Sequence, residues 1–117
     1  MSYDIDVYCP CCESTLLGLG NYTSNMTKFF VDFGVYPKDF DGGTPESVRE
    51  ALKAGLANIL VEIRKDRAAL DTKYNPANKW GNVQSAINWL TEMEQKLAVY
   101  AVTHPDKYKT AKVTVSA

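Results

Sequence analysis

Hydrophobic and polar residues alternate at the start of the chain, which is the pattern of a strand with one buried face. Apolar side chains fall on one side of residues 4–9, and acidic or polar side chains fall on the other. Residues 14–19 are long and apolar enough to return as a second strand, although Gly18 weakens it. The alternation resumes over residues 111–115, which we expect to form the last strand.

Two segments that follow asparagine-rich stretches carry apolar residues at helical spacing. Residues 26–33 form a short helix with an aromatic face, and Gly34 follows them as a natural stop. Asn82 can cap another helix, which should finish near Val102 because Pro105 disfavours helical geometry at the residue before it. These segments predict the first and third helices.

The clearest helix start lies between these two segments. Thr44 is a capping residue, Pro45 suits the first helical position, and Glu46 favours the positive end of the helix dipole. We expect the helix to end somewhere in residues 66–74. Its apolar stripe consists of Val48, Leu52, Leu56, Ile59, Leu60 and Ile63.

The elements together predict an α+β fold. Three helices pack on a small two- or three-stranded, mainly antiparallel sheet, and the first and last strands pair with each other. The chain has 117 residues, of which 45% are hydrophobic and 23% charged, as in an ordinary globular protein. A chain of this length buries one core, so residues 1–117 form a single domain.

The charge pattern narrows the classes of partner. The formal net charge is −1, and the 13 basic residues are scattered, which disfavours nucleic acid as a partner. No apolar stretch approaches the length that crosses a bilayer, and residues 1–6 are acidic where a secretory signal would be basic and then apolar. We therefore expect a cytoplasmic protein with no membrane partner.

The cysteines lie in one short segment, at Cys9, Cys11 and Cys12, too close together for a disulfide framework. Cys9 and Cys12 make a C-x-x-C pair, which is half of a zinc site. The single histidine, His104, lies near the other end of the chain, so we expect a second chain to complete any such site. The alternative is a turn with small, partly buried thiols and no cofactor.

Motifs of common catalytic sites are absent from the sequence. Nucleophile elbows, Walker loops, the dinucleotide glycine fingerprint and the H-E-x-x-H motif do not occur. His104 has no evident orienting partner and suits a helix end. We therefore predict no enzyme activity and no catalytic residues.

Two polar loops that contain aromatic residues precede the first and third helices. Helix amino termini offer unsatisfied N–H groups, so these loops are candidate binding surfaces. Because both helices pack on the same sheet, the loops should be neighbours. Capping and packing are the alternative explanation. The candidate binding residues are Tyr22, Asn25, Asn78 and Trp80.

An ordered series of motifs resembles a family of small uncharacterised bacteriophage and prophage proteins. The motifs are residues 3–8, residues 21–25 before an aromatic helix, the Gly43-Thr44 helix start, and residues 75–82. The resemblance implies a phage accessory protein made in the bacterial host cell, and it implies no reaction. We expect such a protein to act by binding a host or phage protein, or a copy of itself.

Overall fold

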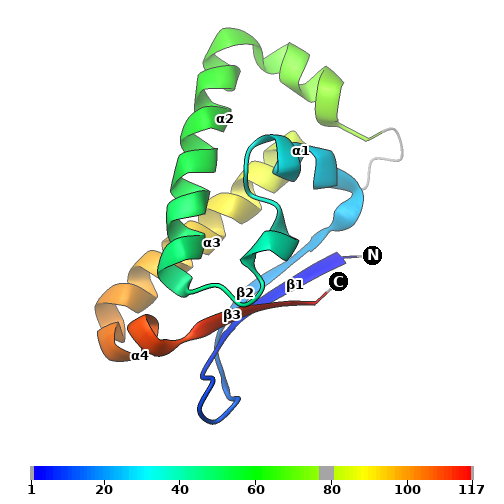
Figure 1. Cartoon of the computed structure of the whole chain (residues 1–117). Helices are drawn as coiled ribbons and strands as arrows, with labels where there is room; N and C mark the ends of the chain where they lie inside the picture. The colour runs from blue at the N-terminus through cyan, green and yellow to red at the C-terminus, as the bar shows by residue number, and fades with distance from the viewer. Residues whose placement is uncertain (1, 77–80, 117) are drawn as a thin grey trace.

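Three strands and the helices on one side of them make up the computed structural model, which describes residues 2–76 and 81–116 (Figure 1). The strands are β1 (Ser2–Tyr8), β2 (Thr15–Thr23) and β3 (Lys112–Ser116). The helices are α1 (Thr27–Asp32), α2 (Pro45–Tyr74), α3 (Val83–Thr103) and α4 (Pro105–Thr110), with the short 3-10 helices η1 (Ser24–Met26) and η2 (Pro37–Phe40). The predicted α+β class is confirmed.

The sheet is antiparallel in the order β2-β1-β3. The predicted pairing of the first and last strands is confirmed, since Asp4 lies opposite Ser116 and Val7 opposite Val113. One face of the sheet is buried beneath the helices, with Ile5 and Val7 completely covered, which is what the alternation of apolar residues in β1 requires. The chain ends therefore lie side by side at one edge of the domain (Figure 1).

The second strand is longer than the alternation indicates. We expected a loop at residues 21–25, and this was wrong, because β2 continues to Thr23 and Tyr22 pairs with Tyr3 of β1. Two shifts of register let β2 keep pairing past its glycines, and Gly20 adopts a φ of 96° that favours glycine. Thr23 then caps η1, because its hydroxyl oxygen accepts a hydrogen bond from the backbone N–H of Asn25 at 3.3 Å.

The helix starts read from the sequence are confirmed at α2 and α3. At α2, the Thr44 hydroxyl accepts from the backbone N–H of Ser47 at 3.1 Å, and the Ser47 hydroxyl accepts in return from the backbone N–H of Thr44. At α3, Asn82 and Ser85 make the same reciprocal pair. Gly34 ends α1 with a φ of 72°, as its sequence position predicts.

The apolar stripe of α2 is confirmed in part. Leu52 and Ile59 are buried, but Leu60 is 47% exposed. The helix also breaks at Asp66, where φ is −165° and ψ is 96°, and the Asp66 carboxylate accepts from the backbone N–H of Ala69 at 3.1 Å. Asp66 thus caps a second helical segment, which leans towards α1 and ends at Tyr74.

A fourth helix was not expected. Pro105 ends α3 as predicted, but it also occupies the first turn of α4, where a proline ring fits a helix without loss of a hydrogen bond. His104 between the two helices has non-helical angles, with φ at −137° and ψ at 62°. Tyr108 of α4 is buried and donates a hydrogen bond to the Glu46 carboxylate at the start of α2, so α4 packs against the start of α2.

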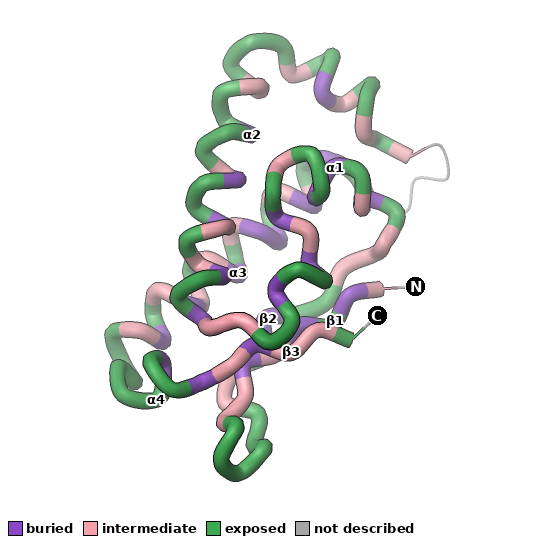
Figure 2. The backbone as a smooth tube through the Cα atoms, in the orientation of Figure 1, coloured by how far each residue is buried: buried purple, intermediate pink, exposed green. Residues whose placement is uncertain are grey.

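The turn between β1 and β2 extends beyond the helices, and residues 10–14 of it are exposed (Figure 2). This projecting turn contains every cysteine of the chain. Within the described ranges, none of the helices combines the length and the apolar run that crossing a bilayer requires.

Candidate functional site

Two backbone hydrogen bonds shape the turn between β1 and β2. The backbone N–H of Cys9 donates to the carbonyl of Ser14 at 2.9 Å, and the N–H of Glu13 donates to the carbonyl of Cys9 at 2.7 Å. Glu13 adopts a φ of 59°, the left-handed conformation that reverses the chain. These bonds fold residues 9–12 into a tight arc at the end of the hairpin.

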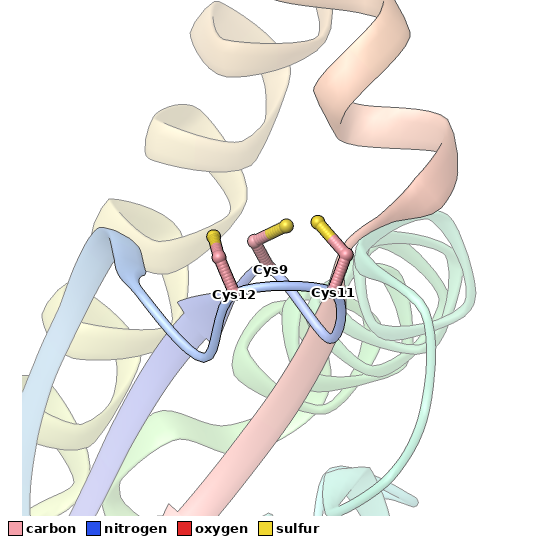
Figure 3. Close-up of side chains that lie close together, drawn as sticks. All are labelled: Cys9, Cys11 and Cys12. Carbon is pink, nitrogen blue, oxygen red and sulfur yellow. The ribbon is translucent and has the colours of Figure 1, made fainter.

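The arc brings three thiols together. The sulfur atoms of Cys9, Cys11 and Cys12 all lie within 4.8 Å of one another. Figure 3 shows the three side chains rising from the same side of the turn. All three cysteines are free; Cys9 is half-buried, and Cys11 and Cys12 are exposed. The alternative of small, partly buried thiols therefore fits Cys9 alone.

The three thiols differ in acidity. The pKa of Cys12 is lowered to about 7, because the hydroxyl and then the backbone N–H of Ser14 donate hydrogen bonds to its sulfur. The pKa of Cys11 is raised to about 11, first through its hydrogen bond with Cys9 and then through loss of hydration. One thiol of the cluster is thus close to half ionised at neutral pH, which makes Cys12 the first nucleophile or metal ligand.

The sequence identified Cys9 and Cys12 as a ligand pair but missed Cys11. The C-x-x-C spacing covers two cysteines separated by two residues, whereas the arc also turns the cysteine between them towards the others. The sequence signal for this third thiol is the density of cysteines, since residues 9–12 contain three cysteines and Pro10. The structure therefore offers three ligands from one chain where the sequence indicated two.

His104 lies outside the thiol cluster. Its ring stacks on Tyr100 with 4.7 Å between centroids, and its Nδ1 is 2.9 Å from the Thr103 hydroxyl. Among the described residues, the potential metal-binding group around the turn consists of the cysteines, with no histidine or carboxylate in it. His104 therefore has the helix-end position that its neighbours in the sequence predict.

The two asparagine-rich segments do meet at one point. The Tyr22 hydroxyl donates to the carbonyl oxygen of Asn82 at 3.1 Å and contacts the Ser85 hydroxyl, so the end of β2 lies against the start of α3. The Tyr22 ring stacks on Trp89 with 5.2 Å between centroids. Tyr22 therefore has a structural role in seating α3, which is the packing alternative considered for it.

The other three residues proposed for that surface divide into two groups. Asn25 is exposed on η1, which leaves its side chain accessible to a partner. Asn78 and Trp80 lie outside the described residues. The contact between the two segments is thus made by Tyr22 and the beginning of α3. Asn25, near the end of β2, is accessible to a partner.

Two of the hollows among the described residues are lined by residues other than the cysteines. A cavity of about 600 Å³ lies between the end of α1 and the second segment of α2, and its walls mix acidic, basic and apolar side chains. A shallower groove of about 290 Å³ runs between β2 and the second half of α3 and is mainly apolar. The groove is lined by Leu17, Glu92, Gln95, Lys96, Val99, Tyr100 and Thr103.

Comparison with known proteins identifies no relative. Protein-family models give no match to the chain, and comparisons with curated proteins and with solved structures give no significant match. The resemblance to phage and prophage proteins therefore rests on the sequence motifs alone.

Proposed function

We propose that this protein is a non-enzymatic module that binds a soft metal ion through Cys9, Cys11 and Cys12. The observation that supports the proposal is the distance of at most 4.8 Å between any two of the three sulfurs. A metal–sulfur bond of about 2.3 Å places two sulfurs on one ion roughly 4 Å apart, so small rotations of the side chains complete the site. Exposure of Cys11 and Cys12 leaves these rotations unhindered.

Zinc, the ion that the C-x-x-C pair in the sequence indicates, is one candidate for this site. A structural zinc ion takes four ligands, so the three thiolates of one chain would leave one position for water or for a residue of a second chain. Cysteine thiolates bind soft ions in preference to magnesium or calcium, which require oxygen ligands. The donor set therefore favours zinc, copper(I) or a related thiophilic ion.

Elemental analysis of protein purified without chelator and under reducing conditions tests this function. We expect about one metal ion per chain in the native protein and its loss in the Cys9→Ser and Cys12→Ser variants. Glu13→Gln is the matched control, because Glu13 is exposed on the same turn and should leave the metal content unchanged. A native protein without metal that also takes up no zinc or copper(I) when either is added would contradict the proposal.

Protein binding is the second candidate function, and the apolar groove between β2 and α3 favours it. Val99 in this groove is 62% exposed and Val102, one turn further along α3, is 81% exposed. Exposed apolar side chains next to an apolar groove are characteristic of contact surfaces. A second copy of the chain is the simplest occupant to test.

Sedimentation at increasing protein concentration tests this second function. Self-association through the groove should be lost in Val99→Asp and retained in Val31→Asp, a control that is 51% exposed on α1. A native protein that stays monomeric at every concentration would exclude the groove as a self-association surface.

The setting we propose for either function is that of a phage or prophage accessory protein in the cytoplasm of the bacterial host. The support is the motif series of residues 3–8, 21–25, 43–44 and 75–82. Free thiols are in keeping with a reducing compartment. Detection of the transcript or the protein only after phage infection or prophage induction would test this setting.

A further inference from the structure

We propose that the ion held by this turn is copper(I), bound by the three thiolates of a single chain in a trigonal site. This inference rests on the proposed metal-binding function and goes beyond it by naming the ion, the coordination number and the number of chains. It removes the need for the second chain that a site built on Cys9 and Cys12 would require.

The number of sulfur donors favours copper(I) over zinc. Three sulfurs lie within 4.8 Å of one another, and in the described part of the chain no imidazole or carboxylate belongs to the same group. Zinc and iron–sulfur clusters take four protein ligands in their closed sites. Copper(I) is a soft, monovalent ion that thiolates bind well, and three thiolates satisfy it without a fourth ligand. The three thiolates of one chain therefore match the number of ligands that copper(I) needs.

The position of the turn separates the thiols from other ligands. The turn extends from the end of the hairpin beyond the helices (Figure 2), and among the described residues no further histidine or carboxylate joins the group of thiols. His104 stacks on Tyr100 and contacts Thr103, so its ring has other partners. The part of the chain that the structure describes thus offers zinc no fourth histidine, cysteine or carboxylate ligand, whereas three thiolates complete a copper(I) site.

The backbone hydrogen bonds of the turn also favour binding by one chain. The N–H of Cys9 donates to the carbonyl of Ser14 at 2.9 Å, and the N–H of Glu13 donates to the carbonyl of Cys9 at 2.7 Å. These bonds hold the three sulfurs in one group before an ion binds, so the turn needs little rearrangement to form the site. Binding releases the protons of the thiols that are still neutral, so no oxidant or reductant takes part when copper is supplied as copper(I).

Competition titration of the reduced, full-length protein tests the inference. Copper(I) is titrated anaerobically against a copper(I) chelator and zinc against a zinc chelator, while light scattering follows the molecular mass. We expect one copper(I) per chain, no increase in molecular mass when copper is added, and copper(I) affinity well above zinc affinity. X-ray absorption should show three sulfur ligands on copper.

The Cys11→Ser variant separates trigonal binding from binding by the C-x-x-C pair. Its copper(I) affinity should fall at least about tenfold, since even the outer partners of a metal ligand cause losses of that size. Glu13→Gln should leave the affinity unchanged. Unchanged affinity in Cys11→Ser, or one copper per two chains, would overturn the trigonal single-chain site. Zinc bound as tightly as copper(I) would overturn the choice of ion and leave the proposed function standing, whereas binding of neither ion would remove both.

Discussion

The hydroxyl of Tyr74, the last residue of α2, donates a hydrogen bond of 2.6 Å to the carboxylate of Asp32, the last residue of α1. The Tyr74 ring also packs edge-on against Phe29, with 5.1 Å between centroids. These contacts hold the second segment of α2 against α1. We expect Tyr74→Phe to lower the free energy of unfolding by about 1 kcal/mol, the usual contribution of one hydrogen bond, as measured by urea denaturation.

The same pair predicts a loss of stability at alkaline pH. Burial and then the Asp32 carboxylate raise the pKa of Tyr74 to about 12, from its ordinary value of 10. The phenol thus ionises less readily in the folded state than in the unfolded state. The resulting contribution to stability is fully present below pH 10 and is lost as the pH rises through 12. The unfolding free energy of the native protein should therefore fall more steeply over this interval than that of Tyr74→Phe. Parallel curves would show that the phenol ionises equally in the folded and unfolded states.

The break of α2 at Asp66, which brings Tyr74 to Asp32, could not be predicted from the sequence. Residues 60–74 contain no proline or glycine, so local propensity favours one continuous helix. The structure breaks it at Asp66 because tertiary contacts compensate, namely a buried Leu70 and the bond between Tyr74 and Asp32. By contrast, the cap at Thr44 depends on adjacent residues and could be read directly.

Burial along the helices predicts which leucines matter most. Leu52→Ala and Leu90→Ala should each lower the unfolding free energy by about 2–5 kcal/mol, because both side chains are completely buried. Leu56 is half-buried, so Leu56→Ala should cost less than either. Leu60→Ala is the exposed control and should change stability by less than about 0.5 kcal/mol. Equal losses at Leu52 and Leu60 would be incompatible with the observed orientation of α2.

The reciprocal cap at the start of α2 should be measurable. Thr44→Ala removes the acceptor of the Ser47 N–H, and we expect a cost of about 1 kcal/mol and a decrease in Tm of roughly 4 °C. Thr44→Ser keeps the hydroxyl and should retain most of the stability. A Thr44→Ser variant as unstable as Thr44→Ala would assign the effect to the lost methyl group and not to the cap.

Gly55 permits a close approach between α2 and the segment after α1. A Cβ atom at this position would lie 2.4 Å from the Cγ1 of Val35 and 3.0 Å from the carbonyl oxygen of Phe33. Glycine to alanine usually stabilises a helix by about 1 kcal/mol, but here we expect Gly55→Ala to destabilise by about 1–3 kcal/mol through overpacking. Adding Val35→Ala should relieve part of this cost, so the two changes should be non-additive in thermal melts.

The candidate site was predictable in kind but not in composition. The C-x-x-C spacing of Cys9 and Cys12 indicated thiol chemistry at a turn, because spacing alone limits how far apart two sulfurs can lie. The position of Cys11 beside the other two cysteines depends on the backbone hydrogen bonds that close the arc. The density of cysteines in the segment indicated further thiols nearby, but the distances between the sulfurs, which make Cys11 a third ligand, required the structure.

The acidity of Cys12 gives a prediction that holds for the metal-free protein. With a pKa of about 7, Cys12 should react with iodoacetamide faster at neutral pH than Cys11, whose pKa is about 11. Its alkylation rate should rise with pH around a midpoint near 7, as followed by mass spectrometry of the derived peptides.

Ser14→Ala removes the hydroxyl that contributes most to the lowered pKa of Cys12, so the midpoint should move to higher pH. The backbone N–H of Ser14 persists in that variant, so the midpoint should stay below the ordinary thiol value. An unchanged midpoint in Ser14→Ala would mean that the neighbouring thiols, and not Ser14, set the acidity of the cluster.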